Sequence, residues 1–299
     1  KISGAFQRQD ETIEAPEYVI PFSEKIILEK IADDKAFNLL EKTDEYLLYK
    51  YNDGIKIKLY IANDKSVVKK VFELSSSIEF LESFYAVCNA KKIEASSSEV
   101  EIFEAGGLQY IPPFLRESKT ILALAAKNAI PEVVQPGDIK GIIHCHSNWS
   151  DGSNTVEELA MACKSQGYEY LVLSDHSKSA FYAQGLTEEK ISAQHQLVDE
   201  LNKKLSPFRI FKSIESDILN DGNLDYSNNI LSTFDLVIAS VHSNLKMTEE
   251  KAMMRLINAI ENPYTSILGH MTGRLLLSRK GNPVDYKKII DACAANKVV

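Results

Sequence analysis

The second half of the sequence alternates short, uniformly apolar segments with longer amphipathic ones. Segments that are apolar on both faces are typical of parallel strands that helices cover from both sides. The amphipathic segments repeat their apolar residues at helical spacing. Repeated strand–helix units therefore predict an α/β domain over residues 138–299, either a barrel or a doubly wound sheet. The expected strands are residues 141–145, 170–173, 209–214, 236–239 and 266–268, and the expected helices are residues 155–166, 187–205, 249–260 and 284–295.

The first 110 residues follow a different, α+β pattern. Residues 17–20 and 55–61 are expected as strands, with helical spacing after them. Asp53-Gly54 is a strong hairpin signal in front of the second of these strands. Prolines punctuate residues 111–137, which we expect to form a linker. The predicted organisation is an N-terminal domain over 1–110, a linker over 111–137 and a second domain over 138–299.

Composition excludes several classes of protein. The longest apolar run, residues 121–126, is far shorter than the ~20 residues that cross a bilayer, and the first residues do not form a signal peptide. The four cysteines form no CxxC pair, which argues against a disulfide framework and a zinc ribbon. We therefore expect a cytoplasmic protein with no membrane partner. The net charge of −8 repels polyanions at long range, so a nucleic-acid substrate would have to be held by local contacts.

Histidines lie at the carboxyl ends of the predicted strands. Five of the six histidines occupy such positions, and in parallel α/β folds this edge of the sheet is where sites are built. His144 and His146 are two residues apart, so on an extended strand their side chains would share one face. Two carboxylates accompany the histidines. The candidate metal ligands are His144, His146, Asp151, His176, Glu215, His242 and His270.

This mixture of ligand types indicates a particular chemistry. Imidazole nitrogens combined with carboxylates suit zinc, manganese or iron. Seven candidate ligands exceed what a single ion takes from a protein, so we expect more than one ion. Neighbouring divalent ions can bind a phosphate ester, lower the pKa of a bridging water and offset charge on the leaving oxygen. Each residue alone has a structural explanation, but their recurrence at five strand ends favours one site for hydrolytic phosphoryl chemistry.

Other polar residues in this half are interpreted as structural. His195 lies in a polar helix, away from any strand end, and is expected to be solvated. Asp217, Asp221 and Asp225 lack the spacing of an EF-hand loop and are expected in a solvated loop. Cys145 should point to the opposite strand face from its histidine neighbours, which favours a thiol in the core.

Six short motifs carry the candidate ligands. They read His144-Cys145-His146, Ser150-Asp151-Gly152, Asp175-His176-Ser177, Ile214-Glu215-Ser216-Asp217, Ala239-Ser240-Val241-His242-Ser243 and Gly269-His270. Together they resemble a PHP domain (polymerase and histidinol phosphatase). The resemblance implies a distorted (β/α)7 barrel with up to three metal ions, held by these seven ligands. The family's late Asp-x-His pair has no counterpart before Val299, which implies either a fragment or an incomplete cluster, in a barrel that is incomplete at its C-terminal end.

The first half resembles part of another family. Residues 107–117 (Gly-Leu-Gln-Tyr-Ile-Pro-Pro-Phe-Leu-Arg-Glu) are similar to the junction between polymerase and PHP parts in bacterial X-family DNA polymerases, and residues 4–13 resemble their palm motif. In active members the palm motif runs into a Gly-Asp-x-Asp metal site. This chain has Glu14-Ala15-Pro16-Glu17 there, and Lys58 where a further carboxylate is expected. The resemblance therefore implies a degenerate palm and thumb remnant over 1–110 without polymerase activity.

The two resemblances imply a function. We expect a metal-dependent phosphoesterase that acts on DNA 3′ ends, as a 3′-5′ exonuclease or phosphodiesterase in repair, with two to three ions of manganese, zinc or iron. Arg274 is expected to clamp a substrate oxygen, because arginine meets phosphate with a fork of donors. Two alternatives stay open: a small-molecule phosphomonoesterase of histidinol-phosphatase type, and a non-catalytic module that binds DNA or a repair partner.

Overall fold

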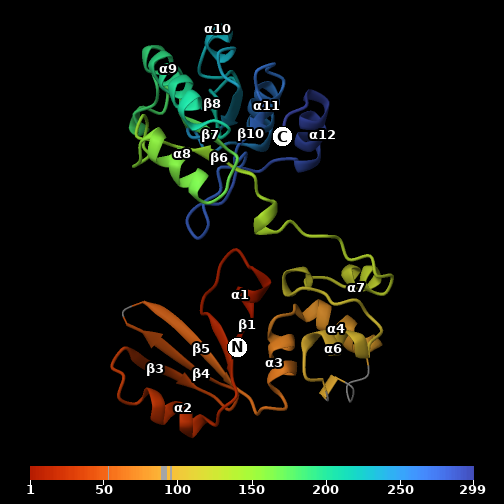
Figure 1. The fold of residues 1–299 in the computed structure, drawn as a ribbon. Helices are drawn as coiled ribbons and strands as arrows, with labels where there is room; N and C mark the ends of the chain where they lie inside the picture. Colours follow the sequence, from red (N-terminus) through yellow and green to blue (C-terminus); the bar gives the residue numbers. More distant parts are fainter. Residues whose placement is uncertain (53, 89–92, 95) are drawn as a thin grey trace. The chain divides into compact units, whose positions relative to one another are not determined.

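The computed structural model describes residues 1–52, 54–88, 93–94 and 96–299. The chain divides into two compact units, unit 1 (Lys1–Val133) and unit 2 (Val134–Val299), which are drawn in Figure 1. Each unit is built on its own sheet. Within the described ranges, no helix combines the length and the apolar character that a membrane span requires.

The strands of unit 2 pair in parallel, in the order β10-β9-β8-β7-β6. Each strand therefore lies beside the next one in the sequence, and the sheet curls like part of a barrel (Figure 1). The alternation of apolar and amphipathic segments correctly predicts this α/β arrangement. The strands are β6 (Gly141–Cys145), β7 (Tyr170–His176), β8 (Arg209–Asp217), β9 (Leu236–Ser240) and β10 (Ile267–Leu268).

Helices connect these strands, and side-chain oxygens cap several of them. Thr155 and Glu158 form a capping box at the start of α8, and Thr187 and Thr248 accept hydrogen bonds from the first turns of α9 and α11. The α-helices are α8 (Val156–Ser165), α9 (Glu188–Leu205), α10 (Asn228–Leu231), α11 (Glu249–Ile260) and α12 (Tyr286–Asn296), and the 3-10 helices are η2 (Pro136–Asp138) and η3 (Phe181–Ala183).

Two apolar cores hold the sheet of unit 2 in place. Leu171 and Leu173 of β7 pack with residues of α8 and α9, and Ile214 of β8 and Val237 of β9 pack with residues of α11. Full burial of such a side chain stabilises the fold by about 1.5–3 kcal/mol. Because both cores fix the strands, they also fix the positions of the carboxyl ends of these strands.

β7 and β8 continue further than their apolar segments predict. The expected strands end at residues 173 and 214, whereas β7 ends at His176 and β8 at Asp217. The added residues are polar but buried, and the Ser174 hydroxyl donates to Ser213 Oγ across the two strands (3.1 Å). The parallel ladder can therefore continue, and it places His176 directly beside Glu215.

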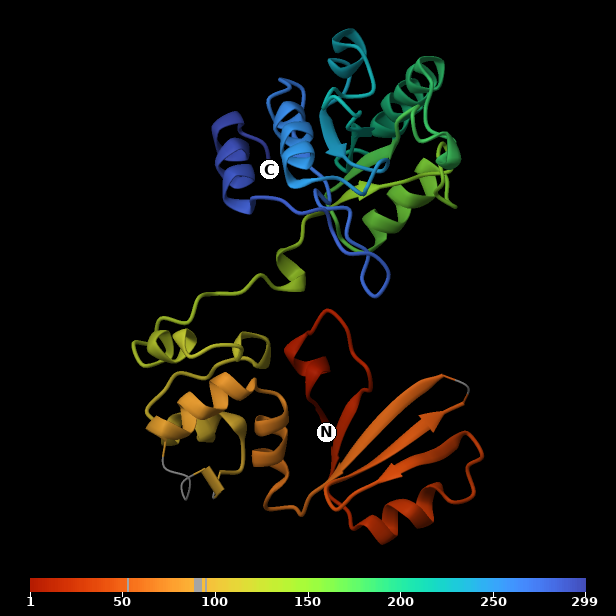
Figure 2. The same cartoon turned by 180° about the vertical axis from the view of Figure 1, so that it is seen from behind.

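Unit 1 contains a mixed sheet in the order β1-β2-β5-β4-β3. β2 and β5 are parallel, and the other neighbours are antiparallel. In β5, Leu59 packs with Ile27 of α2 and Tyr60 packs with Val71 of α3, so α2 and α3 cover opposite faces of the sheet; Figure 2 shows α2 lying along it. The strands are β1 (Ile2–Ser3), β2 (Glu17–Ile20), β3 (Phe37–Lys42), β4 (Tyr46–Tyr51) and β5 (Ile55–Ile61).

The predicted hairpin turn lies only partly within the described residues. β4 and β5 are antiparallel and pair Tyr51 with Ile55, so the connection between them spans three residues. Asp53, the first residue of the Asp-Gly signal, lies outside the described residues.

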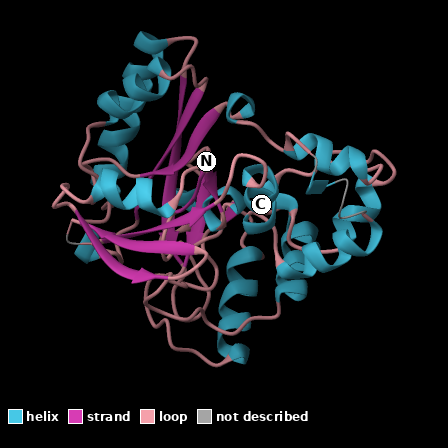
Figure 3. Ribbon diagram, turned by 90° about the horizontal axis from the view of Figure 1, so that it is seen from below, coloured by secondary structure: helices cyan, strands magenta, loops and turns pink. Residues whose placement is uncertain are grey.

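Outside the sheet, the described part of unit 1 consists mainly of helices and loops (Figure 3), and its core contains several aromatic rings. Phe72, Phe80, Phe84 and Phe103 are fully buried, with ring centroids 4.9–6.4 Å apart. Edge-to-face and offset contacts of this kind stabilise a core beyond the area that they bury. The helices of unit 1 are α1 (Ala5–Arg8), α2 (Glu24–Ile31), α3 (Val67–Leu74), α4 (Ile78–Val87), α6 (Glu99–Ala105) and α7 (Thr120–Ala125), with the 3-10 helix η1 (Pro113–Leu115).

Much of the segment predicted as a linker packs into this aromatic core. Ile111 and Ile121 are buried in it, and the fully buried guanidinium of Arg116 lies 5.1–5.7 Å from the rings of Phe72, Phe103 and Tyr110. The two compact units separate only after Val133. Prolines signal irregular backbone in residues 111–137, but irregular backbone can still be packed against a core, and here most of it is.

Candidate metal centre

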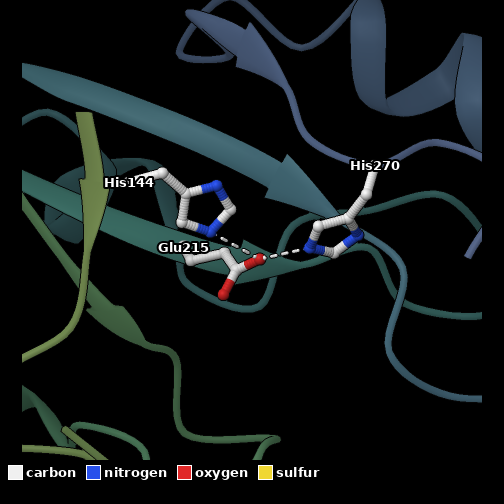
Figure 4. A group of neighbouring side chains, drawn as sticks. All are labelled: His144, Glu215 and His270. Atoms are coloured by element: carbon white, nitrogen blue, oxygen red, sulfur yellow. Dashed lines mark hydrogen bonds and ion pairs between the residues drawn. The ribbon is translucent and has the colours of Figure 1, made fainter. Parts of the chain in front are cut away.

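The seven predicted ligands converge at the carboxyl ends of the strands of unit 2, around the side chain of Glu215. This side chain is 1% exposed. Its Oε1 lies 2.9 Å from His144 Nε2, 2.9 Å from His270 Nε2 and 3.1 Å from His242 Nε2. Figure 4 shows the rings of His144 and His270 reaching this carboxylate from opposite sides. One buried oxygen is thus shared by a side chain of β6 and by side chains that follow β9 and β10.

The other carboxylate oxygen faces a second pair of histidines. Glu215 Oε2 lies 3.0 Å from His176 Nδ1 and 3.5 Å from His146 Nε2. Asp151 closes this side of the cluster, with its oxygens 3.5 Å from His146 Nδ1 and 3.5 Å from His176 Nε2. The side chains of Asp151 and His270 are 49% and 46% exposed, so the centre opens to solvent at these residues.

The ligand atoms fall into three groups that share members. Within each group, one atom per residue lies within 4.8 Å of the others. Glu215 belongs to two of the groups and His176 to two, so the groups adjoin one another. The groups are His144, Glu215 and His270; His146, Asp151 and His176; and His176, Glu215 and His242.

The backbone at His144 differs from the expected extended strand. Its φ is +62°, and the pairing of β6 with β7 shifts register between Ile142 and Cys145. The backbone at His144 is therefore not extended, whereas the prediction assumed that it was. The rings of His144 and His146 nevertheless lie 5.4 Å apart, because the bulge turns His144 towards the centre. A non-glycine residue in this left-handed region costs free energy, and such residues concentrate at functional sites.

Asp175 holds the loop that carries Asp151. This buried carboxylate accepts hydrogen bonds from the backbone and hydroxyl of Ser147, from the Ser150 hydroxyl and from the amide of Gln194, at 2.6–2.8 Å. Asp175 precedes His176 in β7, so the two side chains point to opposite faces of the strand. Asp175 belongs to the same motif as His176, but its sequence position alone does not reveal this role.

Asp217 orients His242. Its Oδ1 lies 2.5 Å from His242 Nδ1, and its side chain is 4% exposed, so the expectation of a solvated loop residue is wrong. Asp217 is the last residue of β8 and stands two residues after Glu215, on the same face of the strand. When Nδ1–H donates to a carboxylate, Nε2 is left as the ligand atom, which is the usual arrangement at histidine–metal sites.

Two more polar residues that were predicted to be solvated are less exposed than expected. Asp225 is buried and accepts hydrogen bonds from the backbone and hydroxyl of Ser179, whereas Asp221 is exposed in its turn. His195 is half-buried against the ring of Phe234 (4.9 Å between centroids), and burial lowers the pKa of this histidine. The polar helix pattern predicted a solvated side chain for His195. One face of α9 packs against the sheet, however, and His195 is partly buried there.

The electrostatics of the centre favour a buried negative charge. Burial alone would raise the pKa of Glu215, but the imidazoles of His144, His242 and His270 prevail and hold it far below its ordinary range. Burial opposes protonation of His242 as well, yet its contacts with Asp217 and Glu215 raise its pKa to about 9. At His176 burial prevails and lowers the pKa.

These residues fit a set of divalent cations. The Nδ1 atoms of His146 and His176 are buried and lack a hydrogen bond of normal geometry, although each faces a carboxylate oxygen. When nitrogen and oxygen atoms converge without hydrogen bonds of normal geometry, the arrangement is the one expected of residues that bind the same metal ions. The donor set of five imidazoles and two carboxylates suits zinc, manganese or iron.

Arg274 lies in the loop that follows β10. A turn links it to the centre, since the Gly273 N–H donates to the carbonyl of His270 (2.9 Å). The Arg274 backbone N–H contacts Thr272 Oγ1, and its side chain is exposed.

Cys145 is half-buried, and burial raises the pKa of its thiol.

Unit 1 carries a separate cavity at the residues that resemble the palm motif. The cavity has a volume of 290 Å³. Lys58 Nζ lies 3.9 Å from Glu17 Oε1 and 4.7 Å from the ring centroid of Tyr46, and Lys56 Nζ lies 2.9 Å from Glu14 Oε1. Lysine ammonium groups therefore occupy the neighbourhood of these carboxylates. The lining residues are Ala5, Glu14, Ala15, Glu17, Glu41, Leu48, Lys56 and Lys58.

Comparisons with known proteins point to two kinds of relative, although no family model matches the sequence. The sequence is 40% identical over 200 residues to the DNA polymerase/3′-5′ exonuclease PolX of Bacillus subtilis, a match that covers 67% of this chain and 35% of the relative. It is 29% identical over 143 residues to a probable phosphatase of Thermoanaerobacter (46% of this chain, 54% of the relative) and 33% identical over 94 residues to a probable phosphatase of Caldanaerobacter subterraneus (30% and 35%).

The chain spans between about a third and about half of the length of these relatives. It is homologous to the polymerase/exonuclease of Bacillus subtilis and to probable bacterial phosphatases.

Proposed function

We propose that unit 2 is a metal-dependent phosphoesterase of the PHP type that hydrolyses phosphodiesters at DNA 3′ ends. The observation that carries the proposal is the buried carboxylate of Glu215, which five histidines surround and which links three adjoining ligand groups. Two to three divalent ions of manganese, zinc or iron would fill these groups. Ions placed in this way lower the pKa of water towards neutrality and offset charge on a phosphate ester.

The residues of the chain divide the remaining work. Glu215 and Asp151 supply the negative charge that holds cations, and the exposed side of the centre at Asp151 and His270 admits the ester. Asp217 fixes the ring of His242, and Asp175 fixes the loop of Asp151. Arg274, close to His270 along the chain, would bind a non-bridging phosphate oxygen through its guanidinium.

The choice of DNA over a small ester rests on similarity. The polymerase/exonuclease of Bacillus subtilis matches two thirds of this chain, and its name includes a 3′-5′ exonuclease. The probable phosphatases match a smaller part of the chain and favour a second candidate, a small-molecule phosphomonoesterase of histidinol-phosphatase type. If no hydrolysis occurs, the third candidate is a non-catalytic module that binds DNA or a repair partner.

Unit 1 is proposed to be a degenerate polymerase palm and thumb that does not transfer nucleotides. Nucleotidyl transfer requires clustered carboxylates that hold two magnesium ions. Ala15 offers no ligand oxygen, and Lys58 adds a positive charge 3.9 Å from Glu17. During DNA repair, unit 1 would then bind DNA or a repair partner instead of synthesising DNA.

The test compares the wild-type chain with His144→Ala on single-stranded DNA labelled at its 5′ end and on a small phosphomonoester. The variant should lose hydrolysis and part of the bound metal, while the circular dichroism spectrum stays unchanged because the His144 side chain is 28% exposed. His195→Gln is the matched control, since His195 lies outside the three groups and should keep activity. Cleavage of the monoester alone would favour the second candidate, and full activity of His144→Ala would refute the proposal.

A further inference from the structure

Two aromatic side chains stand exposed in the loop that follows β7. Phe181 and Tyr182 open the short helix η3, and their exposed fractions are 84% and 65%. Their ring centroids lie 6.2 Å apart, in an edge-to-face arrangement. Large apolar rings that are adjacent and exposed are a common mark of a binding surface.

This aromatic pair adjoins the candidate metal centre. The ring centroid of Tyr182 lies 6.4 Å from that of His176, and His176 belongs to two of the three ligand groups. A ligand whose phosphate is held at the centre would therefore have the ring of Tyr182 within reach, with the ring of Phe181 beside it.

The loop presents its rings outward because its small residues point inward. Ala180 and Ala183 are 0% and 2% exposed, whereas the two residues between them face solvent. The N–H of Leu186 donates to the carbonyl of His176 (2.8 Å) and closes the loop at its base. At Gly185, a Cβ atom would lie 1.9 Å from the carbonyl oxygen of Ser177, so this close approach requires glycine.

A second set of contacts anchors the start of the same loop. Asp225 accepts a hydrogen bond from the N–H of Ser179 (2.6 Å), and the Tyr226 hydroxyl accepts one from the N–H of Lys178 (3.0 Å). Both acceptors come from the segment after β8. These contacts tie down the start of the loop, and a loop that is already ordered loses less entropy on binding.

We infer that Phe181 and Tyr182 form a stacking platform for the terminal base of a nucleic acid whose 3′-terminal phosphodiester lies at the metal centre. The inference rests on the proposed function and narrows its substrate to strands with an unpaired 3′-terminal base. Aromatic side chains stack on any base, because every base has a π-face. With a net charge of −8, the chain gains little from long-range attraction of DNA, so short-range stacking supplies the contact that holds the strand.

The first experiment measures the hydrolysis of two single-stranded oligonucleotides that differ only in whether the 3′-terminal nucleotide carries a base or is abasic. The wild-type chain should prefer the base-bearing strand by roughly tenfold or more, from the usual size of one stacking contact. Phe181→Ala/Tyr182→Ala should hydrolyse both strands at the same rate, and Phe181→Tyr/Tyr182→Phe should keep the preference. Tyr286→Ala is the control, because Tyr286 is a similarly exposed ring on α12.

The second experiment reads stacking without hydrolysis. The oligonucleotide carries 2-aminopurine as its 3′-terminal base and a phosphorothioate at its last linkage, which slows cleavage, and it is added to the chain as purified with its metal. Stacking should quench the fluorescence with the wild type and not with Phe181→Ala/Tyr182→Ala. Equal quenching by both, or a base preference that survives in the double alanine variant, would overturn the platform. Ring-dependent quenching by a chain that hydrolyses neither strand would refute the proposed function and leave the platform standing.

Discussion

Units 1 and 2 each place carboxylates at a sheet, and the two units neutralise these charges differently. In unit 1, Lys58 Nζ lies 3.9 Å from Glu17, and these residues are register partners on the parallel strands β2 and β5. In unit 2, Glu215 faces imidazoles whose ring nitrogens can each serve as a ligand. In unit 1 the ammonium group of Lys58 neutralises Glu17. In unit 2 the histidines around Glu215 could instead bind a metal ion together with this carboxylate.

The difference extends to burial. The side chains of Glu17 and Lys58 are 20% and 26% exposed, while that of Glu215 is 1% exposed. Burial raises the pKa of Glu17 despite the nearby lysine, but the pKa of Glu215 stays far below its ordinary range. A carboxylate that is deeply buried and still ionised requires strong partners, and for this reason we propose the metal centre in unit 2 and not in unit 1. Substitutions in either unit can test this difference.

Glu215→Gln should have the largest effect. Changes to residues that only orient ligands typically cost 10–100-fold in metal affinity or activity, so neutralising the shared ligand should cost more than about 100-fold in hydrolysis and release most of the metal. Metal content by mass spectrometry and the rate on single-stranded DNA measure both effects. Glu169→Gln, at an exposed glutamate, should change neither. A Glu215→Gln protein with its full metal content would show that the carboxylate is structural.

Asp217→Ala should have the next largest effect. Without the contact at Nδ1, the ring of His242 loses its orientation, and metal affinity should fall by about 10–100-fold. Asp217→Asn should fall less, because its amide oxygen can still accept the hydrogen bond from Nδ1–H. Metal titration of these variants is compared with Asp221→Ala, an exposed position in the same segment. If Asp217→Ala binds metal as the wild type does, Asp217 does not position His242.

These residues also show how far sequence alone could reach. The candidate ligands were predictable because apolar strands followed by histidines fix a common edge of a parallel sheet, and this geometry depends on few details. Asp217 was missed because its role depends on where β8 ends, and the apolar pattern stops three residues earlier, at Ile214. Polar residues that continue a buried strand carry no hydrophobic signal.

Packing between elements that are distant in the sequence also could not be predicted from the sequence. Arg255 lies in an amphipathic helix, yet it is fully buried and donates to the carbonyls of Leu219, after β8, and Ser243, after β9. Residues 111–126 contain turn signals that indicate a linker, but their apolar side chains find a core in unit 1. In both cases the outcome depends on partners that are distant in the sequence.

Arg274 provides an intermediate test. If its guanidinium binds the phosphate, Arg274→Ala should lower kcat/KM by roughly tenfold while the metal content stays unchanged, because charge-assisted hydrogen bonds contribute about 1.5–3 kcal/mol. Arg274→Lys should recover only part of the loss, since an ammonium group lacks the planar fork. Lys280→Ala, at an exposed cation in the same loop, separates a specific contact from general charge. Equal losses at both positions would contradict a clamp at Arg274.

Lys58→Met should have the smallest effect, and it tests the other side of the comparison. The ion pair with Glu17 is partly exposed, so its loss should cost no more than about 1 kcal/mol. Because burial already raises the pKa of Glu17, ionisation of this carboxyl costs stability as pH rises above about 4.3, its unfolded value, and the lysine offsets that cost. The destabilisation by Lys58→Met should therefore be present at pH 7 and nearly absent at pH 4. Hydrogen exchange in β2 and β5 measures it within unit 1. A loss of equal size at both pH values would show that Lys58 stabilises the sheet through its contact with the Tyr46 ring instead of through charge.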